Sequence, residues 1–166
     1  MASHSSIQDI HGRLATRLRE QAEDIRRLAS GLDEQLLAER VFPDKWSLKE
    51  TICHLWRVQE VFESRIEAML TEVNPALTPY DPVHDDEFLD KLKSPAAELL
   101  DGLLTEREQL LTLLDSLSPA DWHRPGCHPE YPHYDVHFQV EYMVYHEAHH
   151  IYSMFQRRAP MGKIPH

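Results

Sequence analysis

Apolar residues recur at intervals of three and four along most of this chain, which is the period of an amphipathic helix. The longest run spans residues 6–40, and its apolar positions include Ile10, Leu14, Leu18, Ala22, Ile25, Leu28, Leu32 and Leu36. Gly31 lies inside this run, and we expect a break or kink there because glycine disfavours a helix interior. No segment carries a convincing strand pattern. The chain is therefore expected to fold from helices.

The second helical segment begins with a capping box. Ser47 caps the first turn with its side chain, and Glu50, three residues later, binds back to the serine backbone. The segment continues to about Glu72, and Asn74-Pro75 ends it because proline disfavours helical geometry in the residue before it. A proline-rich connection over 74–84 follows.

Two more helical segments complete the chain. The third has a short lead over 85–93 and restarts with Ser94 as N-cap and Pro95 at the first helical position. A turn-rich loop follows it, and the fourth segment runs from about Asp135 to Arg158. Four segments long enough to pair predict an all-α four-helix bundle.

Length and composition fit one domain over residues 1–166. Hydrophobic residues make up 42% of the chain and charged residues 27%, as in ordinary globular proteins. We find no apolar run of the roughly 18 residues that a membrane span needs, and no signal peptide. Two cysteines, Cys53 and Cys127, are too few for a disulfide framework. A cytoplasmic location is the expectation.

The formal net charge of -11 weighs against two classes of partner. An acidic surface repels the phosphates of nucleic acid and of anionic membranes, so we expect neither as a partner.

Histidine is the unusual component, with 12 residues in the chain. Seven of them fall in one short stretch: His123, His128, His133, His137, His146, His149 and His150. His146 and His150 are four residues apart, so both rings reach the same side of a helix and can bind one metal ion. Two ligands are only half of a site.

A helical wheel of the fourth segment separates these histidines. At about 100° per residue, Val140, Met143, Glu147, Ile151 and Met154 lie on the same side as Val136, which is the expected core face. His150 and His146 lie roughly 40° and 80° to one side of Val136, whereas His149 points to solvent.

The same wheel places the carboxylate of Glu147 in the interior, and the alternative is a slight rotation of the helix that exposes it. A buried carboxylate is costly unless it is paired or bonded to a metal site. On the second segment His54 lies at the flank of the apolar stripe. The pattern by itself favours a partly buried polar residue there over a metal ligand, and Cys53 beside it is expected to act as a small hydrophobe.

Three stretches of the chain, in the right order, resemble the DinB-like (DinB/YfiT) superfamily of metalloenzymes. They are Trp46-Ser47-Leu48-Lys49-Glu50 with His54-Leu55, Asp121-Trp122-His123-Arg124-Pro125-Gly126-Cys127-His128, and His146-Glu147 with His149-His150. The resemblance implies a four-helix bundle in up-up-down-down order. It also implies a divalent metal, zinc or nickel, held by His54, His146 and His150.

The resemblance extends to other residues. Glu147 stands where the family often has an acid, which makes it a catalytic candidate, either as a general base or by orienting a histidine ligand. The family tryptophans correspond to Trp46 and Trp122, which we interpret as packing residues. His128, His133 and His137 depart from the family pattern and add possible ligands.

Three neutral imidazoles leave a coordination position open, as in catalytic zinc sites. The leading hypothesis is a metal-dependent enzyme acting on a small molecule, by hydrolysis or by transfer of a low-molecular-weight thiol. The alternatives are a non-catalytic metal- or ligand-binding bundle and a purely structural helical module. A cavity beside the open position favours the enzyme, whereas closure of the site by His128 or His133 would make the metal structural.

Substrate and assembly are open at this level. Arg65, Arg107 and Arg124 could meet a substrate carboxylate, but surface ion pairs explain them as well. Relatives often form homodimers, and Trp56 could serve such an interface, although a core position is the simpler interpretation.

Overall fold

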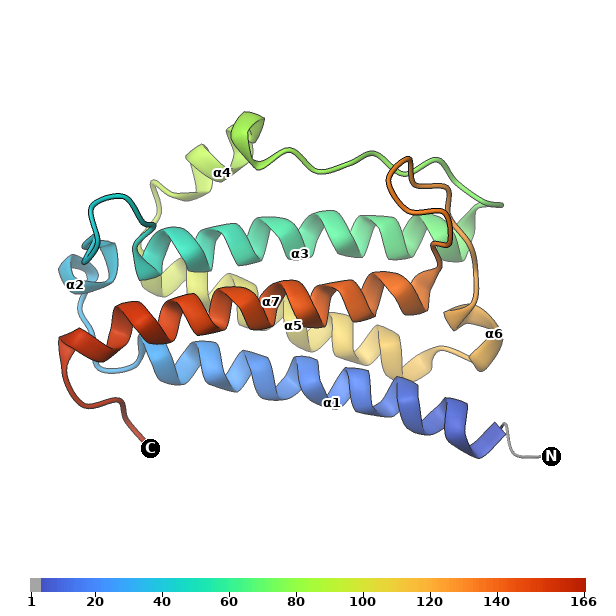
Figure 1. The fold of residues 1–166 in the computed structure, drawn as a ribbon, viewed down its shortest axis with the longest axis horizontal. Coiled ribbons are helices and arrows are strands. Elements are labelled where there is room, and N and C mark those ends of the chain that lie inside the picture. The colour runs from blue at the N-terminus through green and yellow to red at the C-terminus, as the bar shows by residue number, and fades with distance from the viewer. Residues whose placement is uncertain (1–3) are drawn as a thin grey trace.

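Four long helices form the body of the protein in a computed structural model that describes residues 4–166, with side chains from residue 10 onward. They are α1 (His4–Ala29), α3 (Leu48–Thr71), α5 (Ala96–Ser116) and α7 (Val136–Arg158) (Figure 1). The connections hold the short helices α2 (Glu34–Ala38), α4 (Asp86–Lys91) and α6 (Pro119–Trp122), and the 3-10 turns η1 (Pro82–His84) and η2 (Ala159–Met161). No strand forms within the described part of the chain. The predicted all-α four-helix bundle is confirmed.

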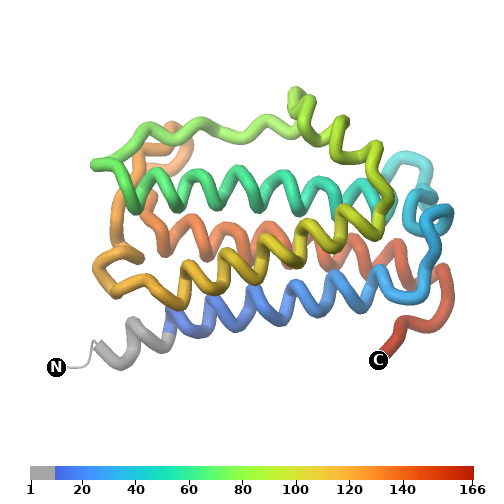
Figure 2. The backbone as a smooth tube through the Cα atoms, turned by 180° about the vertical axis from the view of Figure 1, so that it is seen from behind, coloured from blue at the N-terminus to red at the C-terminus, as the bar shows by residue number. Residues whose placement is uncertain are grey.

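The order of helix directions differs from the expected one. α1 and α7 run in one direction, and α3 and α5 run in the other, as Figures 1 and 2 show from opposite sides. The chain is thus up-down-down-up, and the up-up-down-down order is wrong. The physical reason is that only the connection 72–95, which contains α4, returns along the length of the bundle. An up-up-down-down bundle needs two such crossovers.

Local signals set most helix ends as predicted. Gly31 follows α1 with a φ of 75°, a left-handed conformation that suits glycine. The Ser47 hydroxyl accepts a hydrogen bond from the Glu50 N–H at 3.0 Å, and the Ser47 N–H donates to the Glu50 carboxylate at 2.7 Å. Asp135 caps α7 by accepting from the Phe138 N–H at 2.7 Å.

The start of α5 is the exception. The helix begins at Ala96 with Pro95 in the cap position, so Ser94 does not cap it. The Ala96 N–H donates instead to the Glu34 carboxylate at 2.7 Å. A side chain from α2 thus replaces the local cap that the sequence predicted.

The apolar core consists of two clusters, one toward each end of the bundle. One cluster joins Leu14, Leu18, Val58, Phe62, Ile66, Met69, Leu110, Leu114, Val140 and Met143, among others. The second joins Ile25, Leu28, Leu48, Ile52, Leu55, Leu99, Leu103 and Met154, among others.

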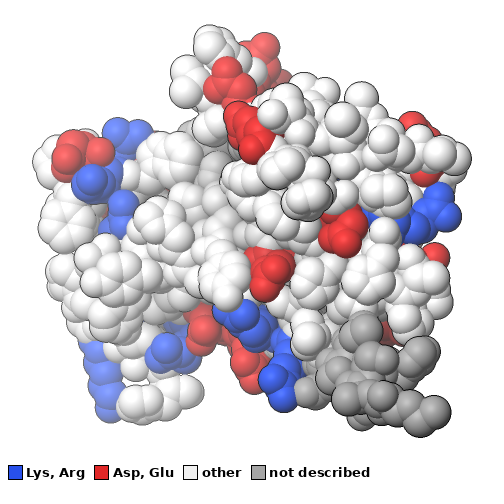
Figure 3. Space-filling view, turned by 45° about the vertical axis from the view of Figure 1, so that its right-hand side comes forward, with Lys and Arg blue, Asp and Glu red and all other residues white. Residues whose placement is uncertain are grey.

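On the surface drawn in Figure 3, acidic and basic groups are mixed, and wide areas carry no charged side chains. None of the described helices combines the length and the apolarity that a membrane crossing requires.

A buried polar layer centred on Arg107 lies between the two clusters. The Arg107 guanidinium donates to both carboxylate oxygens of Glu147, at 2.9 and 2.5 Å. It also donates to the Leu18 carbonyl at 2.8 Å and to the Gln59 side-chain oxygen at 2.7 Å. Arg107 and Glu147 are 1% and 5% exposed. One side chain of α5 therefore binds each of the other three long helices.

This layer predicts a large loss of stability when half of the ion pair is removed. Glu147→Leu leaves a buried guanidinium without its counter-ion, and we expect a loss of about 3–5 kcal/mol in the free energy of unfolding. The double variant Arg107→Met/Glu147→Leu should recover part of this loss, because apolar groups can replace a buried pair. Urea unfolding followed by circular dichroism measures both.

Glu23→Ala is the control, since it breaks the exposed ion pair with Arg26 and should change stability little. A double variant that is less stable than Glu147→Leu would contradict the assigned role of the pair.

Candidate metal centre

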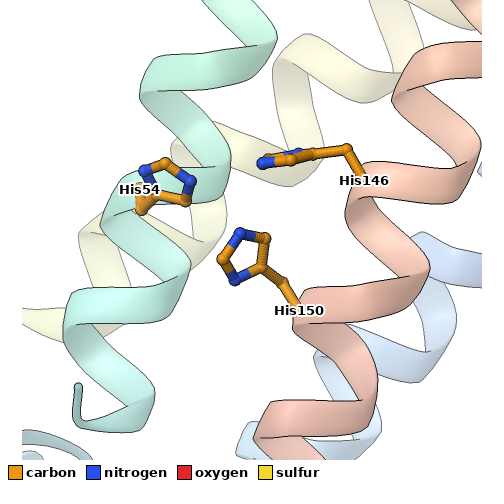
Figure 4. A group of neighbouring side chains, drawn as sticks. All are labelled: His54, His146 and His150. Atoms are coloured by element: carbon orange, nitrogen blue, oxygen red, sulfur yellow. The ribbon is translucent and has the colours of Figure 1, made fainter. Parts of the chain in front are cut away.

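Three histidine side chains meet between two antiparallel helices. α3 supplies His54, and α7 supplies His146 and His150 from successive turns, and the rings point toward one another (Figure 4). One nitrogen from each residue lies within 4.8 Å of the other two. Nitrogens bound to one tetrahedral zinc stand about 3.3 Å apart, given zinc–nitrogen bonds near 2.0–2.1 Å. A small rotation of the rings therefore brings all three onto one ion.

The environment keeps these three rings uncharged. Burial, with a contribution from neighbouring histidines, lowers the pKa of His54 and of His146 to about 4 and that of His150 to about 3. The neutral imidazole is the form that binds metal. The Nδ1 atom of His54 is buried without a hydrogen-bond partner. Three neutral imidazoles are suitable ligands for a metal ion. The buried His54 nitrogen that lacks a hydrogen-bond partner also fits a metal site.

The other histidines stay outside this group. His149 is exposed, as the helical wheel predicted. His128 stacks on Tyr134 with ring centroids 5.1 Å apart, and His133 is exposed. His137 packs near His11, at a centroid distance of 5.3 Å. Within the described residues, the group that could hold an ion contains three histidines and neither His128 nor His133.

Glu147 faces the interior, as predicted, but its carboxylate belongs to the polar layer. Both oxygens accept hydrogen bonds from Arg107. These contacts give Glu147 a structural role in holding α7, and they lend no support to the predicted catalytic role.

Cys53, next to His54, is buried in the apolar core. Burial raises the pKa of its thiol to about 11, so the group is a neutral thiol near pH 7. The interpretation of Cys53 as a small hydrophobe agrees with this environment.

Aromatic side chains line the histidine group, and two of them were not among the predicted site residues. The Trp46 ring centroid lies 4.9 Å from that of His54, so this packing residue belongs to the site. The Tyr80 ring lies 6.3 Å from His54. The Tyr80 hydroxyl donates to Asp85 at 2.6 Å, and Asp85 also accepts from the Arg57 Nε at 3.0 Å. These hydrogen bonds hold the connection 72–95 beside His54. No local pattern in this proline-rich connection predicted them.

Cavities lie beside the histidine group. His150 and Trp46 line an open cavity of about 770 Å³. His146 lines a more enclosed pocket of about 100 Å³, together with Tyr80 and Arg65. Space therefore exists beside the candidate ligands, which is the feature that distinguishes an enzyme site from a closed structural site.

Comparisons with known proteins agree with this arrangement. A family model described as the DinB superfamily matches residues 17–154, a range that contains all three histidines. The chain belongs to the DinB superfamily. A Bacillus subtilis (strain 168) protein with the name "Uncharacterized protein YuaE" is 25% identical over 138 residues, covering 75% of this chain and 84% of that protein.

Two further relatives carry names that mention hydrolysis. The Oceanobacillus iheyensis protein "Putative metal-dependent hydrolase OB0782" is 27% identical over 106 residues, which is 64% of this chain and 61% of that protein. The solved structure of YfiT from Bacillus subtilis, described as "a probable metal-dependent hydrolase with an unusual four-helix bundle topology", matches with a TM-score of 0.80 at 21% identity. That match covers 92% of this chain and 87% of YfiT, and it shows the shared fold.

The geometry predicts one metal ion per chain. After incubation with zinc or nickel and gel filtration, elemental analysis should give about one ion per chain for the wild type. His54→Ala and His150→Ala should each lose most of it, because two imidazoles bind far more weakly than three. His149→Ala is the matched control and should keep its metal, since this exposed side chain lies outside the group. Full metal retention in His54→Ala would refute the three-histidine assignment.

The same ion should join α3 to α7 and raise the melting temperature. Addition of a chelator should lower the melting temperature of the zinc-loaded wild type and of His149→Ala, because binding to the folded state stabilises it. His54→Ala should show no such shift in a thermal scan followed by circular dichroism. An equal shift in His54→Ala would contradict the proposed link.

Proposed function

We propose that this protein is a metal-dependent hydrolase that acts on a small molecule at a zinc or nickel ion held by His54, His146 and His150. The observation that carries the proposal is the convergence of three neutral imidazoles beside open space. The names of two superfamily relatives support the same reaction class.

Three protein ligands leave a coordination position for water or substrate. A bound divalent ion would supply Lewis acidity there, lowering the pKa of a bound water and polarising a carbonyl. The protein's own contribution is positional. The aromatic rings of Trp46 and Tyr80 line the site, and the Arg57–Asp85 pair holds Tyr80 in place.

Thiol transfer is the second candidate. Two cavities, one lined by His150 and one by His146, offer space for two reactants, as transfer of a low-molecular-weight thiol to an electrophile requires. A thiolate is also a good zinc ligand and fits the same open position.

One set of assays distinguishes these reactions. Zinc- and nickel-loaded protein is tested against small esters, amides and lactones for hydrolysis, and against 1-chloro-2,4-dinitrobenzene with cysteine for conjugation. We expect metal-dependent hydrolysis that falls at least about 100-fold in His54→Ala, because the ion is lost, and that persists in His149→Ala. Conjugation without hydrolysis would favour the thiol transferase. Tight metal binding without turnover in either assay would favour a non-catalytic binding bundle.

A further inference from the structure

Three arginines, Arg65, Arg107 and Arg124, were candidates for binding a substrate carboxylate, and the structure separates them. Arg107 is bound to Glu147 in the polar layer. Arg124 donates from Nε to the Met69 carbonyl at 2.6 Å, near the end of α3. Arg65 is 8% exposed, and no carboxylate among the described residues forms an ion pair with it.

The contacts of Arg65 leave its charge without a counter-ion. Its Nη2 donates to the Thr78 carbonyl at 2.7 Å, and its Nη1 donates to the Tyr134 hydroxyl at 3.3 Å. Both of these partners are neutral groups. The Arg65 Nε is buried and has no hydrogen-bond partner. A buried charge is costly unless it is paired, so this guanidinium is suited to an anion supplied from outside the chain.

Arg65 and the candidate metal ligand His146 line the same enclosed pocket. Val58, Phe62 and Arg65 are spaced by four and three along α3, so they share one face of that helix. His146 and Tyr142 come from α7, while the two long connections supply Tyr80, His128, Tyr131 and Tyr134. The pocket therefore brings the candidate ligand His146 together with Arg65, whose guanidinium lies over the Phe62 ring and has no carboxylate partner among the described residues.

His128 also lines this pocket. Its Nδ1 lies 3.1 Å from the Glu130 N–H, which donates to it, so the proton of the neutral ring is on Nε2. Burial and the charge of Arg65 lower the pKa of His128, which favours this neutral form. Glu130 also lines the pocket, but its side chain is exposed to solvent.

We propose that Arg65 binds the carboxylate of a small monocarboxylate substrate and directs its reactive group toward His54, His146 and His150. A single guanidinium balances one negative charge, and a cavity of about 100 Å³ with aromatic walls suits a short or flat acid. A phosphate dianion would bring an unbalanced second charge into this pocket. The proposal rests on the proposed function, and it names the substrate class for that site.

Binding of matched acids and amides tests the proposal without turnover. Propionate and benzoate, with propionamide and benzamide as neutral counterparts, are titrated by NMR into chelator-treated, metal-free protein and into zinc-loaded protein. In both forms we expect the acids to bind at least about tenfold more tightly than the amides, because only the acids form charge-assisted bonds. Arg65→Met should weaken acid binding about tenfold and abolish the discrimination.

Arg124→Met is the matched control, because it removes the same charge from a residue that contacts backbone carbonyls outside the pocket, and it should keep the discrimination. Zinc content of about one ion per chain and an unchanged helical spectrum should show that Arg65→Met is folded. A second measurement, made on the wild type, is the shift of the Arg65 Nε–H resonance, which is assigned by its loss in Arg65→Lys. Benzoate should shift this resonance, and benzamide should not.

Three results would overturn the proposal: equal affinity of wild type for acid and amide, discrimination that survives Arg65→Met, or an Arg65 resonance that benzoate leaves unmoved. If the acids bind only to zinc-loaded protein, and bind Arg65→Met as tightly as the wild type, the carboxylate binds the metal instead. Failure of the wild type to bind zinc would overturn the metal-dependent function, whereas the titrations of metal-free protein would still decide the role of Arg65.

Discussion

The buried ion pair between Arg107 and Glu147 determines how the last helix sits in this bundle. The Arg107 guanidinium, on α5, donates hydrogen bonds to Glu147 of α7, Gln59 of α3 and the Leu18 carbonyl of α1. An apolar interface between helices tolerates small rotations, whereas a fully buried charge pair does not, since any rotation that parts the two groups leaves both unpaired. The polar layer thus fixes the rotation of α7 between two apolar clusters that would otherwise permit several arrangements.

The candidate metal centre depends on that rotation. Glu147 directly follows His146 and precedes His150 by three residues, so the direction of its carboxylate sets the directions of both imidazoles. With Glu147 turned toward Arg107, the two rings face His54 on α3. Glu147, which the sequence linked to catalysis, therefore supports the site indirectly, because its direction sets the directions of His146 and His150.

The surroundings of the site come from the connections between helices. The crossover 72–95 runs beside α3 and brings Tyr80 to His54, where Asp85 and Arg57 hold it. The loop before α7 brings Tyr134 to Arg65. Superfamily relatives with the same bundle can thus differ in the pocket beside the histidines while the helices that present them stay alike.

Features that depend on neighbours along the chain can be predicted from the amino-acid sequence. Helix ends at Ser47 and Asp135, the exclusion of His149 and the inward direction of Glu147 follow from capping chemistry and from the helical period, which act within a few residues. His54 needed the family resemblance, because its local pattern does not distinguish a ligand from a partly buried polar residue.

Other features follow only from the way the helices pack. The helix directions, the capping of Ala96 by Glu34, the partner of Glu147 and the unpaired state of Arg65 all depend on groups far apart in sequence. Arg107 and Glu147 are 40 residues apart, and whether such groups meet is set by how the helices pack. Periodicity identifies the buried face of a helix, but only packing brings a particular partner to it.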